Sequence, residues 1–488
     1  MTHETIYAGE TGSEDFAQAE WLAGRLKGTW RYDHTENKWH HYDNIRWAED
    51  TTHQIERTCS RLAADALVGR GGTPRVDGKA ERAALTKLLN LPPLERALEA
   101  LATLDGYGTD GSDWDQDPYL LGCKNGIVDL RINALTTSSP EQKVTKSTKV
   151  DFYPCESSAD FEDRAPRFMA FLEQVTSDYD WTSDLGMLSF LLLWFGASLF
   201  GMSPEQRFLL MTGGGRNGKG ALKHAILNAV GDYCAQPDAN LYSRTKGGAV
   251  SSSGARADLM AIKGKRVALF SEPDKGQFNE EMLKAHTGGD LITARALYSN
   301  RVISWEPTHS ITFLVNDAPA LEDIGASMAS RVMVADFRHR FDGDAEDKTL
   351  YPALASEREG ILAILVYAAS EWYKSYINGG HGITLPPRVI DQSRAFLERN
   401  DPIADCLRES FAERPSLETP SQKAYEAYMR WHARSGREDE AVSQVKFANV
   451  LEKKGFRKVK RSSGMVWIGL RPLEDMIVTP TEVSDGDE

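Results

Sequence analysis

The chain has 488 residues, more than one hydrophobic core usually supports, so its length predicts about two to four domains. The formal net charge of -14 describes the whole surface and does not exclude a local basic site for nucleic acid. The five cysteines are scattered and form no Cys-x-x-Cys pair, which excludes a zinc or redox site of that type and indicates a reducing, cytoplasmic compartment.

Neither the first residues nor the longest apolar run indicates a membrane protein. Residues 1–20 are polar and acidic, so we expect no signal peptide. The longest apolar run, residues 185–201, is shorter than the roughly 20 residues that a bilayer requires. We expect a buried core helix there and no membrane partner.

The first third of the chain predicts a mixed α+β N-terminal domain over residues 1–155. Aromatic and polar residues alternate over residues 30–47, the pattern of a two-stranded hairpin, and residues 52–104 are mostly helical in pattern. Asn125-Gly126 separates two apolar runs, which predicts a second hairpin. A helical collar or linker is expected over residues 156–206.

Short apolar strands then alternate with helical stretches, which predicts an α/β domain with a mostly parallel sheet over residues 207–345. A helical extension follows over residues 346–400. Asp401-Pro402 breaks the pattern ahead of a small domain over residues 401–475. The acidic tail, residues 476–488, is expected to be disordered.

Residues 207–221 combine an apolar strand, a glycine-rich turn and the start of a helix. Glycines at this spacing let backbone N–H groups surround a phosphate, while Lys219 and the helix N-terminus add positive charge. A glycine-rich turn that binds nothing is the alternative. We expect ATP to bind at Gly213, Gly214, Gly215, Arg216, Asn217, Gly218, Lys219, Gly220 and Ala221. Gly220 stands where a Ser or Thr usually contacts Mg²⁺, so the metal must rely on phosphates, water and acids elsewhere.

Two later strands end in polar side chains suited to ATP hydrolysis. Glu272 follows one strand and is expected to orient the attacking water and hold Mg²⁺, with Asp274 as a second metal candidate. Asn316 follows the next strand and is the candidate sensor of the γ-phosphate. An acid or amide at a strand end is often only a turn residue, but the order and spacing here favour a catalytic set.

The motifs GRNGKG, FSEP, KAHTGGDLITAR and VNDAPAL occur in this order within residues 207–337. They resemble superfamily 3 helicases, in particular the phage and plasmid primase C-terminal family that includes the poxvirus primase-helicase. The tryptophans of residues 30–47 and CKNGIVDL look like the N-terminal helicase-associated domain of that family. The resemblance implies an AAA+-like P-loop ATPase core that uses ATP and Mg²⁺. It also implies a homo-hexamer ring that translocates on single-stranded DNA and unwinds forked DNA during phage, prophage or plasmid replication, in the cytoplasm of a host bacterium.

Ring motors of this kind complete each ATP site with an arginine from the neighbouring subunit, and the resemblance gives that role to Arg331. The alternative is an ordinary surface salt bridge, and Arg216 is the rival candidate. Many relatives carry a second arginine where this chain has Ser330. The resemblance also implies a hairpin over residues 292–307 that points into the ring channel. Its expected DNA contacts pair cations with phosphates and stack an aromatic ring on a base, and they are Lys284, Arg295, Tyr298 and Arg301.

The C-terminal region looks like a small winged-helix domain. An amphipathic helix over residues 443–457 precedes two strands around Ser-Ser-Gly. Eight cations and a single acid lie between residues 446 and 471, a local excess that favours phosphate contact. The alternative is a solvated face of a packing domain. The DNA contacts expected here are Lys454, Lys458, Lys460 and Arg461.

Three other functions compete with the helicase interpretation. Asp113 and Asp115 superficially resemble the metal-binding acids of a primase, but they lie in a polar loop rather than on an apolar strand, so we expect a separate primase or polymerase partner. An origin-binding or replisome-assembly protein would use ATP only as a structural ligand. A small-molecule P-loop kinase would leave the TGGD segment without a purpose.

Overall fold

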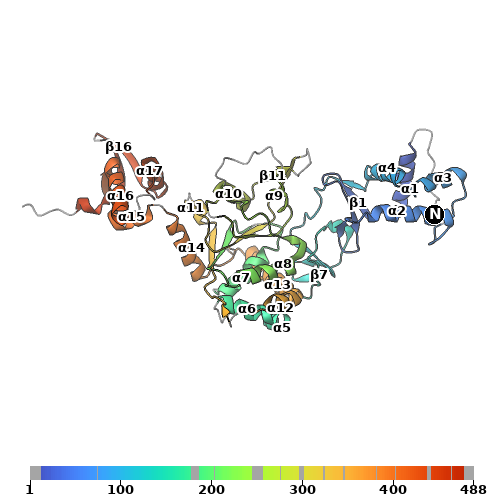
Figure 1. Cartoon of the computed structure of the whole chain (residues 1–488), viewed down its shortest axis with the longest axis horizontal. Helices are drawn as coiled ribbons and strands as arrows, with labels where there is room; N and C mark the ends of the chain where they lie inside the picture. Colours follow the sequence, from blue (N-terminus) through green and yellow to red (C-terminus); the bar gives the residue numbers. More distant parts are fainter. Residues whose placement is uncertain are drawn as a thin grey trace, which may run out of the picture.

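The computed structural model describes residues 13–73, 75–176, 186–202, 204–244, 256–274, 276–295, 302–321, 325–343, 347–380, 382–401, 403–436, 441–462 and 464–476. Its secondary structure is mixed α/β. Figure 1 shows three regions arranged along the longest axis, with the N-terminal helices and the C-terminal module at opposite ends of a central α/β region. The tail over residues 477–488, the tip of the expected hairpin and Pro402 lie outside the described residues.

The described part of the N-terminal region contains four α-helices, a four-stranded sheet and a separate three-stranded sheet. The first expected hairpin is confirmed, because Trp30 pairs with His41 and Tyr32 with Trp39 in antiparallel register. The hairpin at Asn125-Gly126 is also confirmed. The helices are α1 (Glu14–Leu26), α2 (Gln54–Val68), α3 (Lys79–Lys87) and α4 (Leu91–Ala102). The sheets have the orders β3 (Trp47–Glu49), β2 (Lys38–Tyr42), β1 (Trp30–Asp33), β4 (Gly108–Thr109), and β5 (Leu120–Cys123), β6 (Gly126–Asp129), β7 (Ala134–Thr136).

The two aspartates that superficially resemble a primase site have intramolecular partners. Asp113 accepts a hydrogen bond from Arg31 at 3.0 Å and also pairs with Lys143. Asp115 accepts hydrogen bonds from the backbone N–H of Thr145 at 2.8 Å and from Lys146 Nζ at 2.7 Å. Both carboxylates therefore tie neighbouring loops together.

The central region is built on a five-stranded parallel sheet, as expected. Its strand order is β14 (Val332–Asp336), β8 (Phe208–Thr212), β13 (Ser310–Val315), β10 (Val267–Ser271) and β9 (Cys234–Ala235). The strands are nearly continuous apolar runs because both faces of a parallel sheet are covered. Side chains alternate between the two faces: Leu209 and Met211 join one hydrophobic core, while Phe208 and Leu210 join the other.

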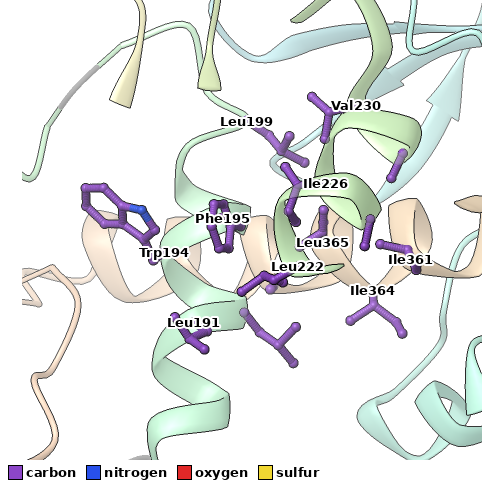
Figure 2. Close-up of a cluster of buried hydrophobic side chains, with 14 of the residues drawn as sticks. Leu191, Trp194, Phe195, Leu199, Leu222, Ile226, Val230, Ile361, Ile364 and Leu365 are labelled. Carbon is purple, nitrogen blue, oxygen red and sulfur yellow. The ribbon is translucent and has the colours of Figure 1, made fainter. Parts of the chain in front are cut away.

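Three helices form the core on one face of the sheet: α7 (Met187–Ala197), α8 (Lys219–Val230) and α13 (Arg358–Ile377). Figure 2 shows their interlocking side chains, including Trp194 and Phe195 of α7, Ile226 of α8 and Ile364 of α13. Gly196 permits close packing of α7 on α13, since a Cβ there would lie 2.7 Å from the backbone nitrogen of Ala369. The apolar run is thus a buried core helix. Among the described helices, none combines the length and the apolar character that crossing a membrane requires.

The remaining central helices are shorter or lie at the edges of the two cores. Of the helices in the expected collar, α6 packs into the same core as α7 and α8. The opposite core includes Leu283 of α10, Met328 of α11 and Phe396 of α14. These helices are α5 (Phe161–Arg164), α6 (Pro166–Thr176), α9 (Ala257–Met260), α10 (Glu280–Gly288), α11 (Ala326–Ala329), α12 (Leu350–Ser356) and α14 (Pro387–Arg399).

The C-terminal module folds around its own core, in which Tyr428, Phe447 and Trp467 are buried. Its three antiparallel strands have the order β15 (Phe411–Pro420), β17 (Gly464–Pro472), β16 (Arg457–Arg461). The expected amphipathic helix is α17 (Gln444–Lys453), and the expected strand pair is β16 and β17. The other helices are α15 (Ala404–Ser410) and α16 (Ser421–Ser435).

A buried polar network links α10 to the sheet. The Tyr242 hydroxyl is hydrogen-bonded to His286 Nδ1 at 2.8 Å and to His309 Nε2 at 3.2 Å. Burial lowers the pKa of His286 to about 4 and that of His309 to about 3. Both imidazoles are therefore neutral in the folded protein at neutral pH.

This network should make the central region sensitive to acid. The unfolded chain binds a proton at each histidine below its ordinary pKa of 6.5, whereas the folded chain does not until the pH nears 4 or 3. The free energy of unfolding is therefore not reduced by these histidines above pH 6.5. Below pH 6.5 it falls by about 1.4 kcal/mol per pH unit for each histidine. Melting temperatures of the wild type and of the double variant His286→Gln/His309→Gln, taken from about pH 7.5 to 5.5, measure this loss. The wild type should lose more on acidification, and equal losses would contradict the assignment.

Candidate nucleotide site

The glycine-rich loop between β8 and α8 has the backbone conformation that only glycine adopts without strain at several positions. Gly215 and Gly218 have φ angles of 84° and 88°. A Cβ on Gly213 would lie 2.0 Å from Asn217 Nδ2, and one on Gly218 would lie 2.5 Å from Val175 Cγ1. The loop's shape thus requires glycine at positions 213, 215 and 218.

Two hydrogen bonds attach this loop to the segment that follows β14. Asn217 Nδ2 donates to the carbonyl oxygen of Phe337 at 3.2 Å. The backbone N–H of Phe341 donates to the carbonyl oxygen of Arg216 at 2.8 Å. The loop is therefore held from the β14 side as well as by β8 and α8.

Three of the predicted catalytic side chains meet beside the loop. Lys219 Nζ donates to the Gly213 carbonyl at 2.7 Å and to Asn316 Oδ1 at 3.2 Å. The Asn316 backbone N–H donates to Glu272 Oε2 at 3.3 Å. They come together because β8, β10 and β13 are parallel neighbours whose carboxyl ends share one edge of the sheet. Burial lowers the pKa of Lys219, and the nearby Glu272 carboxylate opposes that shift.

These side chains line a cavity of about 870 Å³. Its floor is the loop from Gly215 to Ala221 together with Ser271, Glu272, Leu314 and Asn316. Cationic side chains outnumber acidic ones in its wall, which suits a polyanionic ligand. The volume is in the range of small-molecule and cofactor sites.

Several residues of the wall were not predicted from the sequence. Arg167, Phe171 and Gln174 come from α6 or its first turn, and Lys348 and Tyr351 come from the start of α12. No local motif marks them, because they reach the cavity only through packing of α6 and α12 beside α8. Lys223 also lines the cavity, and its spacing of four residues from Lys219 on one helix was the signal that could have revealed it.

Asp274 and Arg216 are less directly placed. Asp274 Oδ2 accepts a hydrogen bond from Asn240 Nδ2 at 2.9 Å, and Asp274 is not among the described residues that line the cavity. Arg216 lines the cavity, and its side chain is exposed and 3.5 Å from Asp342. Of the two acids predicted to hold a metal, only Glu272 therefore faces the cavity.

Arg331 lies at the amino ends of the parallel strands, whereas the cavity lies at their carboxyl ends. It directly precedes β14, and its carbonyl accepts the N–H of Phe208, the first residue of β8. Its Nη1 donates to the carbonyl oxygen and to the hydroxyl of Ser327, at 2.6 and 3.0 Å, whereas its buried Nε has no partner in the described part of the chain. No salt bridge to a described carboxylate involves this guanidinium.

The segment expected to enter a ring channel includes a hairpin of β11 (Ile292–Arg295) and β12 (Val302–Trp305), paired in antiparallel register. Arg295 ends β11 and Lys284 lies on α10. Tyr298 and Arg301 belong to the tip, which lies outside the described residues. The base of the expected hairpin is thus present.

The predicted cations of the C-terminal module differ in their environments. Lys454 pairs with the buried carboxylate of Asp401, and Arg461 pairs with Glu418. Lys458 Nζ lies 5.4 Å from the centroid of the Trp467 ring. Lys460 is exposed on β16. The basic excess is therefore partly balanced by acids that lie elsewhere in the sequence.

Comparisons with known proteins find a family and several viral relatives. Residues 19–177 match the family model described as "D5 N terminal like". A protein named "Putative helicase" from Acanthamoeba polyphaga mimivirus is 23% identical over 403 residues, covering 76% of this chain and 40% of the relative. Another "Putative helicase", from Frog virus 3, is 23% identical over 385 residues, covering 65% of this chain and 39% of the relative. The chain thus spans about two fifths of the length of these relatives.

A further relative and a solved structure complete the comparison. A protein named "Putative primase" from African swine fever virus is 23% identical over 336 residues, covering 65% of this chain and 34% of the relative. The structure described as the A form apo structure of the NrS-1 C terminal region covers 94% of this chain and 99% of its own, at 11% identity and a TM-score of 0.45.

The geometry of the glycine-rich loop can be tested by two matched substitutions. Gly218→Ala should lower the free energy of unfolding by about 1–3 kcal/mol, because the residue has a positive φ and the new methyl group would meet Val175. Gly214→Ala should change it by less than about 0.5 kcal/mol, since nothing lies within 4 Å of a Cβ there. Denaturant unfolding of both variants measures the difference, and equal stabilities would contradict the described loop.

Proposed function

We propose that this chain is an ATP-dependent DNA helicase of superfamily 3, because residues 19–177 match the D5 N terminal like family and the similar proteins are named putative helicase or putative primase. It would hydrolyse ATP to translocate on single-stranded DNA and unwind forks in phage, prophage or plasmid replication. The observation that carries the proposal is the meeting of Lys219, Asn316 and Glu272 in one cavity beside a glycine-rich loop. A protein that only bound nucleotide would not need an acid and an amide directed at the phosphate end of the site.

Each of these groups has a role in the proposed reaction. The backbone N–H groups of the loop and Lys219 bind the phosphates. Glu272 orients the attacking water and takes up its proton, while Asn316 positions that water or the γ-phosphate. Desolvation of the cavity by α6 and α12 would strengthen these electrostatic contacts.

Magnesium is proposed as the metal that accompanies ATP. Glu272, Ser271 and the phosphate oxygens would hold the ion, since oxygen ligands suit a hard cation. The bound ion would supply charge stabilisation of the transferred phosphoryl group. Gly220 offers no hydroxyl, so the P-loop itself contributes only backbone and Lys219.

An AAA+-like core and a hexameric ring are part of the same proposal. The strand order inserts β13 between the P-loop strand β8 and the acid-bearing strand β10, so the loop, Asn316 and Glu272 follow three adjacent strands. Arg331 and the cavity lie at opposite ends of the parallel strands, so Arg331 does not contact the cavity of its own subunit. This position supports a role at the site of a neighbouring subunit. A closed ring would bring each Arg331 to the next cavity.

DNA is the proposed substrate of the motor. The hairpin of β11 and β12 with Lys284 and Arg295 would line the channel, and Tyr298 and Arg301 would form its tip. The C-terminal module has the order helix, strand, helix, helix, strand, strand, which supports a winged-helix-like DNA-binding role. Lys460 is its most open candidate contact, with Lys454, Lys458 and Arg461 partly engaged by other side chains. A separate primase or polymerase is the proposed protein partner.

The catalytic assignment predicts a separation between binding and turnover. Glu272→Gln should retain ATP binding but reduce single-stranded-DNA-stimulated hydrolysis by about 10²-fold or more, because the amide keeps the shape and loses the base. Asp274→Asn should change turnover by less than about threefold, since its side chain is bonded to Asn240 outside the cavity. Phosphate release and nucleotide binding are measured on the same preparations.

Two results would favour other functions. Wild-type ATP binding without turnover, with or without DNA, would indicate an assembly protein. Turnover stimulated by a small-molecule acceptor and not by DNA would indicate a kinase.

The role of Arg331 predicts complementation between inactive subunits. Arg331→Ala and Lys219→Ala should each lack ATP turnover, whereas a mixture should recover part of it. Some mixed interfaces would combine an intact P-loop with an intact arginine from the neighbour. Turnover is measured after subunit exchange has been demonstrated by energy transfer between labelled subunits. An inactive mixture with proven exchange would assign Arg331 a structural role.

A further inference from the structure

The usual side-chain ligands for the metal of a P-loop ATPase are missing from this cavity. Such ATPases hold Mg²⁺ with the Ser or Thr that follows the P-loop lysine and with an aspartate on the acid-bearing strand. The corresponding residues here are Gly220 and, at the end of β10, Ser271 followed by Glu272. Asp274, the nearest aspartate in sequence, is bonded to Asn240 instead. At these positions one neutral hydroxyl and one carboxylate remain; Asp347 also lines the cavity, but it pairs with Arg167.

The space beside Gly220 is bounded by another side chain. A Cβ on Gly220 would lie 3.1 Å from the Tyr351 hydroxyl, which comes from α12. That distance is tighter than ordinary van der Waals contact, so a Ser or Thr at this position would displace the tyrosine. Tyr351 is exposed, so a shift of its hydroxyl by a few tenths of an ångström would be enough.

A second lysine reaches the position that these residues leave open. Lys223 lies one helical turn after Lys219 on α8, on the same face of the helix. Its Nζ donates a hydrogen bond to Ser271 Oγ at 3.1 Å, and the side chain is half-buried in the cavity wall. The ammonium group thus lies at the end of β10, next to the residue that precedes Glu272.

We propose that Lys223 is a second phosphate-binding cation of the ATP site. It neutralises part of the triphosphate charge, so nucleotide binding depends only weakly on a divalent metal. Mg²⁺ held at Glu272 would still supply charge stabilisation for hydrolysis. The proposal rests on the proposed function, because it assigns a role within the same nucleotide site.

The charge of the cavity supports this assignment. Lys219 and Lys223 line the cavity from one helix, and the single acid among the strand-end residues there is Glu272. An ammonium that is shielded from solvent attracts a phosphate more strongly than an exposed one does. Lys348 also lines the cavity but is exposed, so it provides a matched cation in a more solvated position.

The test measures the affinity of the full-length protein for a fluorescent ATP analogue in excess Mg²⁺ and in EDTA. Wild type should bind in both conditions, with affinities that differ by less than about tenfold. Lys223→Met should weaken binding in EDTA by about tenfold or more, the effect of one charge-assisted hydrogen bond, and weaken it less in Mg²⁺. Lys348→Met should leave the ratio of the two affinities unchanged. Lys223→Gln, which can keep the bond to Ser271, serves if the methionine variant does not fold.

The outcomes distinguish a failure of the Lys223 role from a failure of the proposed function. Strictly Mg²⁺-dependent binding by the wild type, or equal effects of Lys223→Met and Lys348→Met in EDTA, would overturn the role of Lys223. A wild type that binds no nucleotide in either condition would overturn the proposed function itself. Melting temperatures without nucleotide show that each variant is folded.

Discussion

The packing of α8 against α7 and α13 is the interaction on which the candidate nucleotide site depends. Leu222, Ile226 and Val230 of α8 are fully buried in this contact, and α8 begins at Lys219 (Figure 2). Burial of large aliphatic side chains contributes about 1.5–3 kcal/mol each, so the helix axis is strongly fixed. A helix held in this way keeps its N-terminal N–H groups and the preceding loop at a constant position relative to the sheet.

The parallel sheet supplies the second half of the arrangement. Its neighbouring strands end at one edge, so residues that are far apart in sequence present their side chains to the same space. Glu272 has a φ of 51°, a left-handed conformation that is uncommon for a residue with a Cβ. Such conformations occur where the surrounding structure compensates for their cost, often in functional sites. The N–H of Glu272 donates to Leu314 at 2.9 Å, which supplies part of that compensation.

Local patterns in the sequence predicted much of this architecture. Continuous apolar strands, the Asn125-Gly126 hairpin and the glycine-rich loop each have a signal within a few residues, and each is present. The wall that contains Arg167 and Tyr351 could not be predicted, because α6 and α12 reach the cavity only through tertiary packing. Counting charges along the sequence also misses tertiary contacts, because a cation can pair with an acid that is distant in sequence. Lys454 contributes to a basic run in the sequence, but it pairs with Asp401, which precedes the first helix of the C-terminal module.

The attachment of the glycine-rich loop to the segment after β14 has a mechanical consequence. β14 is a five-residue strand, roughly 16 Å long, with Phe337 at one end and Arg331 at the other. Pairing with β8 along its whole length makes β14 rigid. A shift of the loop that moves Phe337 through its bond to Asn217 would therefore also move Arg331. The position of Arg331 at one end of β14 thus depends on the position of the glycine-rich loop at the other end.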